Sequence, residues 1–354
     1  VNLGRVGREG LGRGYGMAWV RGERRRAGGM SLRSEADFLR QLASLLTAGV
    51  PPSRGLDALA RQLPGRSRVV ARTLLAAVEQ GEPISSGAVH LPQEFSEAEV
   101  ALLRASERGG QLEAALVRLA EQRETKAEWR DRLLTRLIYP VIMLHAGAMV
   151  NAAVTWFQRG SGPALWALLS LLVPVYGVVA LLVVGIRYAR QMAGLRETVD
   201  TIGWHFPVLG GVLRRLALAR CLHTYEALYL AGVGPVAAID LAASAGDQAV
   251  LSARLQRSRA VLAEGHGLDE ALEAAQVLTP VQLSLVATGV ASGRLDQMLA
   301  KLREQVEREA STAIDRLGRI LPGIAYLIVA IWIISMIIKL MAGYIQGLND
   351  LMNG

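Results

Sequence analysis

Histidine and cysteine side chains carry much of the metal and nucleophilic chemistry of proteins, and this chain of 354 residues contains few of them. The five histidines lie far apart, without the spacing that presents two metal ligands together; they are His90, His145, His205, His223 and His266. The one cysteine, Cys221, excludes an intrachain disulfide framework and a cysteine-based zinc site. It lies in an apolar-rich segment, so we expect a small core residue rather than a nucleophile.

The short motifs that bind phosphates or activate a nucleophile are also missing. The sequence has no Gly-x-x-x-x-Gly-Lys-Ser/Thr loop, so the chain is not itself a P-loop ATPase. It has neither His-Glu-x-x-His nor Gly-x-Ser-x-Gly. We therefore predict no catalytic residue, no cofactor, no metal and no enzymatic activity.

Three apolar stretches dominate the chain. Apolar residues make up 51% of the sequence and charged residues only 20%, a balance shifted toward membrane proteins. The excess lies in residues 137–157, 163–186 and 320–345. A helix needs about 20 residues to cross the hydrocarbon core of a bilayer. We therefore predict an integral membrane protein with three transmembrane helices over these ranges.

Two polar residues, His145 and Asn151, interrupt the first apolar stretch. Polar side chains inside a span are expensive, and they mark either a proton path or a hydrogen bond between helices. The two residues are separated by nearly two helical turns, so they share one face only roughly. We favour contacts between helices for both residues, with a proton path as the alternative.

Lysine and arginine near the ends of the apolar stretches predict the orientation, because they are enriched on the cytoplasmic side. Five precede the first stretch, three follow the second and five precede the third. The opposite side has Arg159 alone, and residues 346–354 have none. Both long polar segments and the N-terminus are thus predicted to be cytoplasmic, with the C-terminal tail, 346–354, outside.

The two polar segments repeat one another at an offset of 183 residues, the separation of Gly49 and Gly232 (232 − 49). The glycine pair Gly110 and Gly293 has the same offset, and Pro140 and Pro322 open the first and third apolar stretches. Fourteen identical positions at a constant offset indicate duplication. These glycines and prolines are the candidate structural positions of the repeat.

Each copy is predicted to be all-α. In the first, apolar residues recur at helical spacing before Gly49, which is placed to end a helix in the left-handed conformation. Ser96 and Glu99 form a predicted capping box at the start of a later helix. No alternating β pattern occurs. The predicted domains are helical bundles over 31–136 and 187–319, each large enough for its own core.

Residues 1–30 contain seven arginines, two glutamates and nine glycines, without apolar periodicity. A basic arm for anionic lipid or nucleic acid is one interpretation. We favour a disordered extension, because nothing in this segment forms a core and Met30 begins a well-formed helical start. Without it the net charge falls from +8 to +3 (7 − 2 = 5), so the basic character is poor evidence for nucleic-acid binding, and we predict no nucleic-acid partner.

Four segments of the sequence together resemble a known family, the type II secretion F family. They are FLRQLASLLTAGVPPSRGLDALA, its partner LHTYEALYLAGVGPVAAIDLAA, the later ASGRLDQML, and RLIYP before the first apolar stretch. The resemblance covers roughly residues 35–345. It implies a bacterial inner-membrane platform protein of type II secretion or type IV pilus assembly, with each cytoplasmic repeat a six-helix bundle. It also implies a homo-oligomer that links a cytoplasmic ATPase to pilin or pseudopilin subunits, beside other inner-membrane assembly proteins.

The repeats depart from the family pattern at its acidic motif. The first copy keeps Glu107 and Gly110 but has Gly109 where the family has serine, and the second has Val290 where the family has glutamate. We therefore assign no metal to these positions. The alternative function is a three-span subunit of an oligomeric transporter energised by a separate ATPase. It is disfavoured because the spans offer few polar side chains for a substrate.

Overall fold

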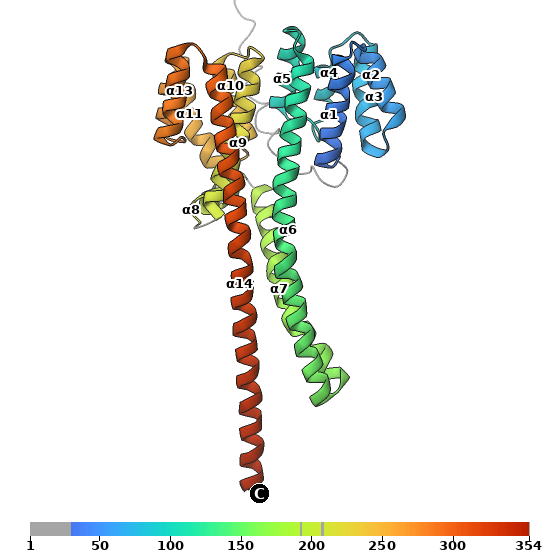
Figure 1. Ribbon diagram of the computed structural model, residues 1–354, viewed down its shortest axis with the longest axis vertical. Helices are drawn as coiled ribbons and strands as arrows, with labels where there is room; N and C mark the ends of the chain where they lie inside the picture. Colours follow the sequence, from blue (N-terminus) through green and yellow to red (C-terminus); the bar gives the residue numbers. More distant parts are fainter. Residues whose placement is uncertain (1–29, 192, 207–208, 354) are drawn as a thin grey trace, which may run out of the picture. The chain divides into compact units, whose positions relative to one another are not determined.

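The computed structural model describes residues 30–191, 193–206 and 209–353, and over these residues the chain is all-α, with fourteen helices and no strand (Figure 1). The first repeat contains α1 (Leu32–Thr47), α2 (Pro52–Gln62), α3 (Gly65–Glu79), α4 (Ile84–Val89), α5 (Glu97–Arg108) and the start of α6 (Leu112–Arg159). After α7 (Ser161–Gln191) and α8 (Ala193–His205), the second contains α9 (Leu209–Leu230), α10 (Pro235–Ala245), α11 (Ala249–Ala263), α12 (Leu268–Ala275), α13 (Pro280–Ser292) and the start of α14 (Leu295–Asn353). The predicted disordered extension falls on residues 1–29, outside the described residues.

The helices group into two compact units. Both repeats belong to the first unit, which comprises the chain up to Glu128 together with Arg190–Ala310. The second unit comprises Trp129–Ala189 and the chain from Ser311 onward. The repeats therefore form one compact body rather than two separate ones.

Glycines in the left-handed conformation end the matching helices of the two repeats. The φ angles are 78° and 77° for Gly49 and Gly232, and 65° and 66° for Gly110 and Gly293. At Gly49 the amide of the following residue donates to a carbonyl five residues back, which closes the helix end. The predicted capping box of Ser96 and Glu99 is present, and the second repeat has its own at Thr279 and Gln282.

Helix α8 precedes the second repeat and packs on it; the positions 183 residues earlier, 10–22, lie outside the described residues. Its Asp200 is buried and accepts a hydrogen bond from the Ala249 amide at 3.1 Å, at the start of α11. Trp204 is also buried, and the guanidinium carbons of Arg214 and Arg254 each lie 5.5 Å from its ring centre. Cation–π and capping contacts thus fasten α8 to the second repeat.

Two long helices run through the boundaries expected from the sequence. The first bundle and first span were expected to meet at 136/137, but α6 continues unbroken from Leu112 to Arg159 with Pro140 inside it. Helix α14 likewise crosses the expected boundary at 319/320. It also continues to Asn353 through the expected outer tail, 346–354. The last helix of each repeat is thus continuous with an apolar stretch.

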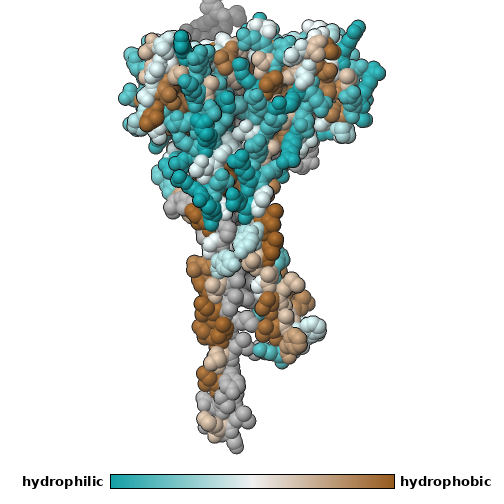
Figure 2. Space-filling view, viewed as in Figure 1, coloured by the Kyte–Doolittle hydropathy of each residue, from teal (hydrophilic) through white to brown (hydrophobic). Residues whose placement is uncertain are grey.

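The second unit is apolar on its surface, unlike the repeats. Two helices are long and apolar enough to cross a membrane, over Leu112–Gln158 and Ser161–Ala189. Large side chains on them are open, including Phe157 at 92% and Trp166 at 75% exposure, and Figure 2 shows brown surface along this unit. The third apolar stretch, 320–345, is helical within α14, and several of its side chains lie outside the described set.

Candidate functional site: polar contacts of the repeats and the first apolar helix

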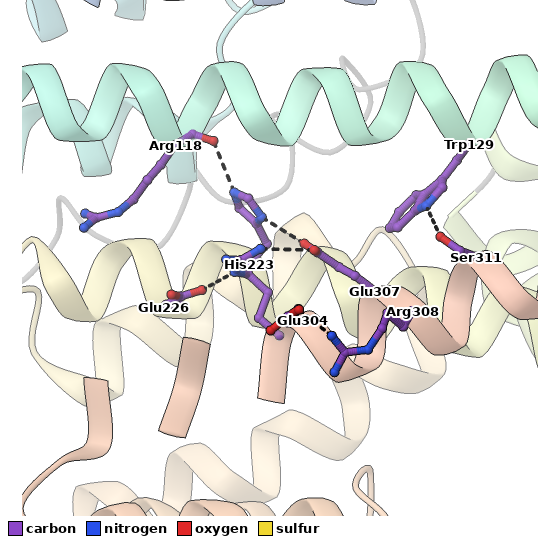
Figure 3. A network of polar contacts seen from close by, with 9 residues as sticks. Arg118, Trp129, His223, Glu226, Glu304, Glu307, Arg308 and Ser311 are labelled. Atoms are coloured by element: carbon purple, nitrogen blue, oxygen red, sulfur yellow. Dashed lines mark hydrogen bonds and ion pairs between the residues drawn. The ribbon is translucent and has the colours of Figure 1, made fainter. Parts of the chain in front are cut away.

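The best-connected polar site of the first unit surrounds His223 on α9, where the two repeats touch (Figure 3). One ring nitrogen, Nδ1, lies 3.3 Å from a carboxylate oxygen of Glu307 on α14. The other, Nε2, lies 3.2 Å from the backbone carbonyl of Arg118 on α6. Both partners only accept hydrogen bonds, so an imidazolium, which donates from both nitrogens, satisfies this geometry fully. His223 thereby ties the second repeat to the first.

Arg303 completes this site by bridging two carboxylates. Its guanidinium pairs with Glu226 on α9 through Nε and with Glu307 through Nη1 at 3.0 Å. Burial of Glu307 opposes its ionisation, but the His223 hydrogen bond and Arg303 outweigh burial and lower its pKa. Glu307 is therefore held in its ionised form between His223 and Arg303.

The first repeat carries a matching ion pair at the same offset. Arg40 and Glu124 lie 183 positions before His223 and Glu307. Arg40 donates to Glu124 from Nε at 2.8 Å and from Nη2 at 2.5 Å. This pair is exposed, with 50% and 40% of the two side chains open to solvent. The duplication thus conserves the pair but buries only the second copy.

A buried charge cluster stabilises the first repeat. Arg123 on α6 lies 2.9 Å from Glu35 on α1 and 3.0 Å from Glu99 on α5. Burial of Glu99 opposes its ionisation, but Arg123, Lys126 and hydrogen bonds from Ser96 outweigh burial and lower its pKa to about 2. Burial and the neighbouring Arg123 lower the pKa of Lys126 to about 8. A buried arginine shared by two carboxylates holds three helices together.

The acidic motif at Glu107 has a structural role. Both carboxylate oxygens of Glu107 accept from the Ser85 amide, each at 3.2 Å, at the start of α4. In the second repeat Val290 occupies this position, and Asp269 and Glu270 lie in the first turn of the corresponding helix, α12. A carboxylate near a helix N-terminus thus persists in both repeats, from different residues.

The two polar residues of the first apolar stretch both contact α7. The Asn151 amide donates to the Ala167 carbonyl at 3.3 Å. His145 contacts the Val141 carbonyl within α6 through Nδ1 at 2.7 Å and the Tyr176 hydroxyl through Nε2 at 3.3 Å. Of the other sequence-predicted positions, Pro140 lies inside α6, and Pro322 falls within α14 with its side chain outside the described set.

These contacts position helices rather than substrates. In the described ranges no three side chains among His, Cys, Asp and Glu gather closely enough to hold a metal ion. Cys221 is buried in α9, and burial raises the pKa of its thiol to about 12, so it stays protonated at neutral pH. The polar side chains described above therefore make contacts between helices.

An all-α chain with an internal repeat, in which each repeat's last helix continues into an apolar stretch, defines a narrow class of protein. The family model for type II secretion system (T2SS) protein F matches residues 38–157 and 225–342, most of the chain in two segments. The chain belongs to this family. The expected resemblance is confirmed, and the two matched segments confirm the internal repeat.

Relatives at 29% to 30% identity come from secretion and from pilus systems. Type II secretion system protein F of Pseudomonas aeruginosa is 29% identical, over 81% of this chain and 76% of the relative. Type 4 fimbrial assembly protein PilC of Pseudomonas putida is 30% identical, over 86% and 81%. Type IV pilus assembly protein PilC of Thermus thermophilus is 30% identical, over 82% and 76%.

The His223 site was not predicted from the sequence. Glu124 and Glu307 are identical at the repeat offset, and they mark the position. Their partners, Arg40 and His223, are different residue types, so a search for identical residues passes over them. A comparison of polar character, rather than of identity, at positions 183 residues apart would find this pair.

Proposed function

We propose that this protein is the inner-membrane platform of a filament-assembly machine, either a type II secretion system or a type IV pilus. Membership in the T2SS protein F family carries the proposal. One relative is named as a type II secretion protein and another as a fimbrial assembly protein, which supports naming both systems. In this function the protein is not an enzyme: it oligomerises, and it links a separate cytoplasmic ATPase to pilin or pseudopilin subunits in the bilayer.

The continuity of α6 and α14 supports the linking role. Each helix begins in a repeat and ends in an apolar stretch, over Leu112–Arg159 and Leu295–Asn353. Backbone hydrogen bonds stiffen a helix along its axis, and Pro140 removes only one of them from α6. A partner that moves a repeat therefore moves the apolar segment, without a flexible linker to absorb the displacement.

The proposed topology has three spans, with six-helix repeats in the cytoplasm and the C-terminus outside. Its support is the length of the apolar stretches and the excess of Lys and Arg beside the repeats. The contacts of Asn151 and His145 with α7 then join the first two spans. Hydrogen bonds of this kind are the usual role of isolated polar residues between transmembrane helices.

Co-purification from the native membrane tests this function. The tagged full-length chain, extracted in detergent, is expected to retain an assembly ATPase and pilin-like subunits, while the purified chain alone releases no phosphate from ATP. Deleting the gene should abolish filament assembly, and the wild-type chain should restore it. Filaments in the deletion strain, together with a chain that retains no ATPase, would contradict the proposal. Loss of uptake or export of a small solute in that strain would favour the transporter alternative.

A further inference from the structure

Within one chain, the first repeat packs on the second through two defined faces. The α5 face consists of Ala98 and Leu102 on α5 with Arg118 and Gln122 on α6, and the α9 face consists of His223, Thr224 and Ala227. Besides the bond between His223 and the Arg118 carbonyl, the Gln122 amide lies 3.5 Å from the Thr224 hydroxyl. Residues of both faces line one gap of about 10 Å³, at the lower limit for a single water. The two faces are therefore closely fitted.

The duplication places a second copy of each face elsewhere on the same chain. At the offset of 183, the α5 face corresponds to an α13 face, which consists of Val281, Leu285, Lys301 and Gln305. The α9 face corresponds to an α1 face, which consists of Arg40, Gln41 and Ser44. Each chain thus carries two pairs of matching faces. The α5 and α9 faces contact each other within the chain, and the α13 and α1 faces form the second pair.

The second pair of faces is more exposed than the first, although Leu285 and Gln305 on the α13 face are half-buried. Val281 is 66% exposed, whereas its counterpart Ala98 is 2% exposed. Arg40, Gln41 and Ser44 are all exposed, whereas His223, Thr224 and Ala227 are 8%, 8% and 3% exposed. Figure 1 places α13 on the side of the second repeat away from the first, and Figure 2 shows brown patches there amid teal. Val281 on the α13 face and the three residues of the α1 face are therefore accessible to a second chain.

The donors that the contact needs are unused on the α1 face. His223 directs one nitrogen to Glu307 and the other across the contact to a backbone carbonyl. Arg40 directs Nε and Nη2 to Glu124, and its Nη1 makes no hydrogen bond within the described part of the chain. The counterpart of the Arg118 carbonyl is that of Lys301. Arg40 can therefore make both bonds that His223 makes, once an α13 face lies against it.

We propose that the α13 face of one copy of this chain packs on the α1 face of a second copy, as the α5 face packs on the α9 face within one chain. The contact is heterologous, because each chain contributes a different face. It repeats from copy to copy, and closes into a ring if the rotation between copies allows. The inference specifies a surface for the oligomerisation included in the proposed function, and it rests on the repeat geometry rather than on contacts with an ATPase or pilin.

Cysteine cross-linking between two differently tagged full-length chains in native membranes tests this contact. Both chains carry Cys221→Ser, one adds Ser44→Cys and the other adds Val281→Cys. Their counterparts, Ala227 and Ala98, line the same gap inside the chain. Oxidation is expected to give a disulfide-linked dimer with both tags. The matched control replaces Ser44→Cys by Val69→Cys, on the exposed surface of α3, and is expected to give little product.

Variants of the α1 face separate the proposed contact from chance collision. Arg40→Glu is expected to abolish the mixed dimer, whereas Arg40→His, the residue of the second repeat, is expected to retain it. Chains with both cysteines should give a ladder beyond the dimer. A mixed product no stronger than the Val69 control would overturn the proposal. So would Val281→Cys chains that cross-link to themselves as well as to Ser44→Cys chains, because the α13 face would then meet itself. Equal amounts of each variant in the membrane exclude misfolding as the cause of a loss.

Discussion

Two arginines of α14 make ion pairs with the same four-residue spacing at very different depths. Arg303 pairs with Glu307 and Glu226, whose side chains are 19% and 10% exposed. Arg308 pairs with Glu304, and both side chains are 63% exposed (Figure 3). Removing a buried cation leaves its carboxylates without compensation, whereas an exposed pair is screened by water. How deeply these ion pairs are buried, rather than how many there are, determines how much they stabilise the fold.

Arg303 is half-buried, with 26% of its side chain exposed, so we expect Arg303→Met to destabilise the protein by about 1 to 2 kcal/mol, and Arg308→Met by about 0.5 kcal/mol or less. The buried thiol of Cys221, on the helix that Arg303 contacts, supplies the measurement. A dye that fluoresces on reacting with thiols reports the temperature at which α9 opens in detergent-solubilised chain. Equal shifts for the two variants would show that burial does not set the contribution.

Glu99 should make the first repeat sensitive to acid. Its pKa of about 2 in the folded protein lies below the ordinary value of 4.5. Ionised Glu99 therefore stabilises the fold above pH 4.5, and this contribution is lost as the pH falls toward 2. The shift corresponds to about 3 kcal/mol at neutral pH. We expect Glu99→Gln to lower the melting temperature at pH 7 and to flatten its decline between pH 5 and 3, measured by circular dichroism. An unchanged slope would contradict this role.

The helix-ending glycine of α9 should tolerate few side chains. Gly232 has a φ of 77°, and a Cβ there would meet nothing within 4 Å. The cost of a substitution is therefore conformational rather than steric. Gly232→Val is expected to destabilise the protein by about 1 kcal/mol or more, because β-branched residues disfavour this conformation. Gly232→Asn should cost less, since asparagine enters it more readily. Equal losses in the thiol-exposure assay would assign the effect to something other than φ.

At the scale of elements, α8 precedes the second repeat in the chain and packs on it. Asp200 fastens it to α11 through the Ala249 amide. We expect Asp200→Ala to speed hydrogen exchange in α8 and in the first turn of α11, and to leave α1–α5 unchanged. Asp240→Ala is the control, because Asp240 pairs with Arg259 at the surface, with 38% and 52% of the side chains exposed. Faster exchange throughout both repeats would show that Asp200 supports the whole unit instead.

Local backbone signals made much of the helical framework predictable. A helix that ends in the left-handed conformation favours glycine there, so Gly49, Gly110, Gly232 and Gly293 mark ends in the sequence and in the structure alike. The capping box at Ser96 works in the same way, because its two hydrogen bonds involve residues only three positions apart. Signals of this kind involve only residues that are close together in the sequence, so they can be recognised without knowing the tertiary structure.

Features that depend on distant parts of the chain were not predictable in this way. Nothing at position 136 ends a helix, and α6 passes through the change from polar to apolar composition there. His223 became part of a site only because α6 of the first repeat lies against α9. Sequence periodicity assigns residues to a helix face, but it does not identify the neighbour of that face.

On the scale of the whole molecule, duplication gave the chain two similar repeats in unequal surroundings. The second repeat buries its α9 face against the first, and the first leaves its α1 face open. A tandem repeat with one satisfied contact and one open contact is already the smallest unit of a larger head-to-tail array. In the contact proposed above, one chain supplies both halves, the open α1 face and the α13 face.

The orientation of the chain in the membrane is the property on which the platform function depends most directly. Five cations beside each of the first and third apolar stretches, against none in residues 346–354, predict that the repeats lie inside and the C-terminus outside. Three exposed positions can report this orientation as single cysteines in a Cys221→Ser chain. Arg61 lies in the first repeat, Phe157 at the end of the first apolar stretch, and Met352 near the C-terminus.

Labelling of spheroplasts with a membrane-impermeant thiol reagent is expected at Phe157→Cys and Met352→Cys, and at Arg61→Cys only after lysis. The reason is that a maleimide with a fixed charge does not cross the hydrocarbon core, where an unpaired charge is strongly disfavoured. Labelling of Arg61→Cys in intact spheroplasts would invert the topology and place the repeats beyond reach of a cytoplasmic ATPase. Labelling at Phe157→Cys without Met352→Cys would show that the third apolar stretch does not cross. The C-terminus would then lie on the same side as the repeats, and α14 could not carry movement of the second repeat across the bilayer.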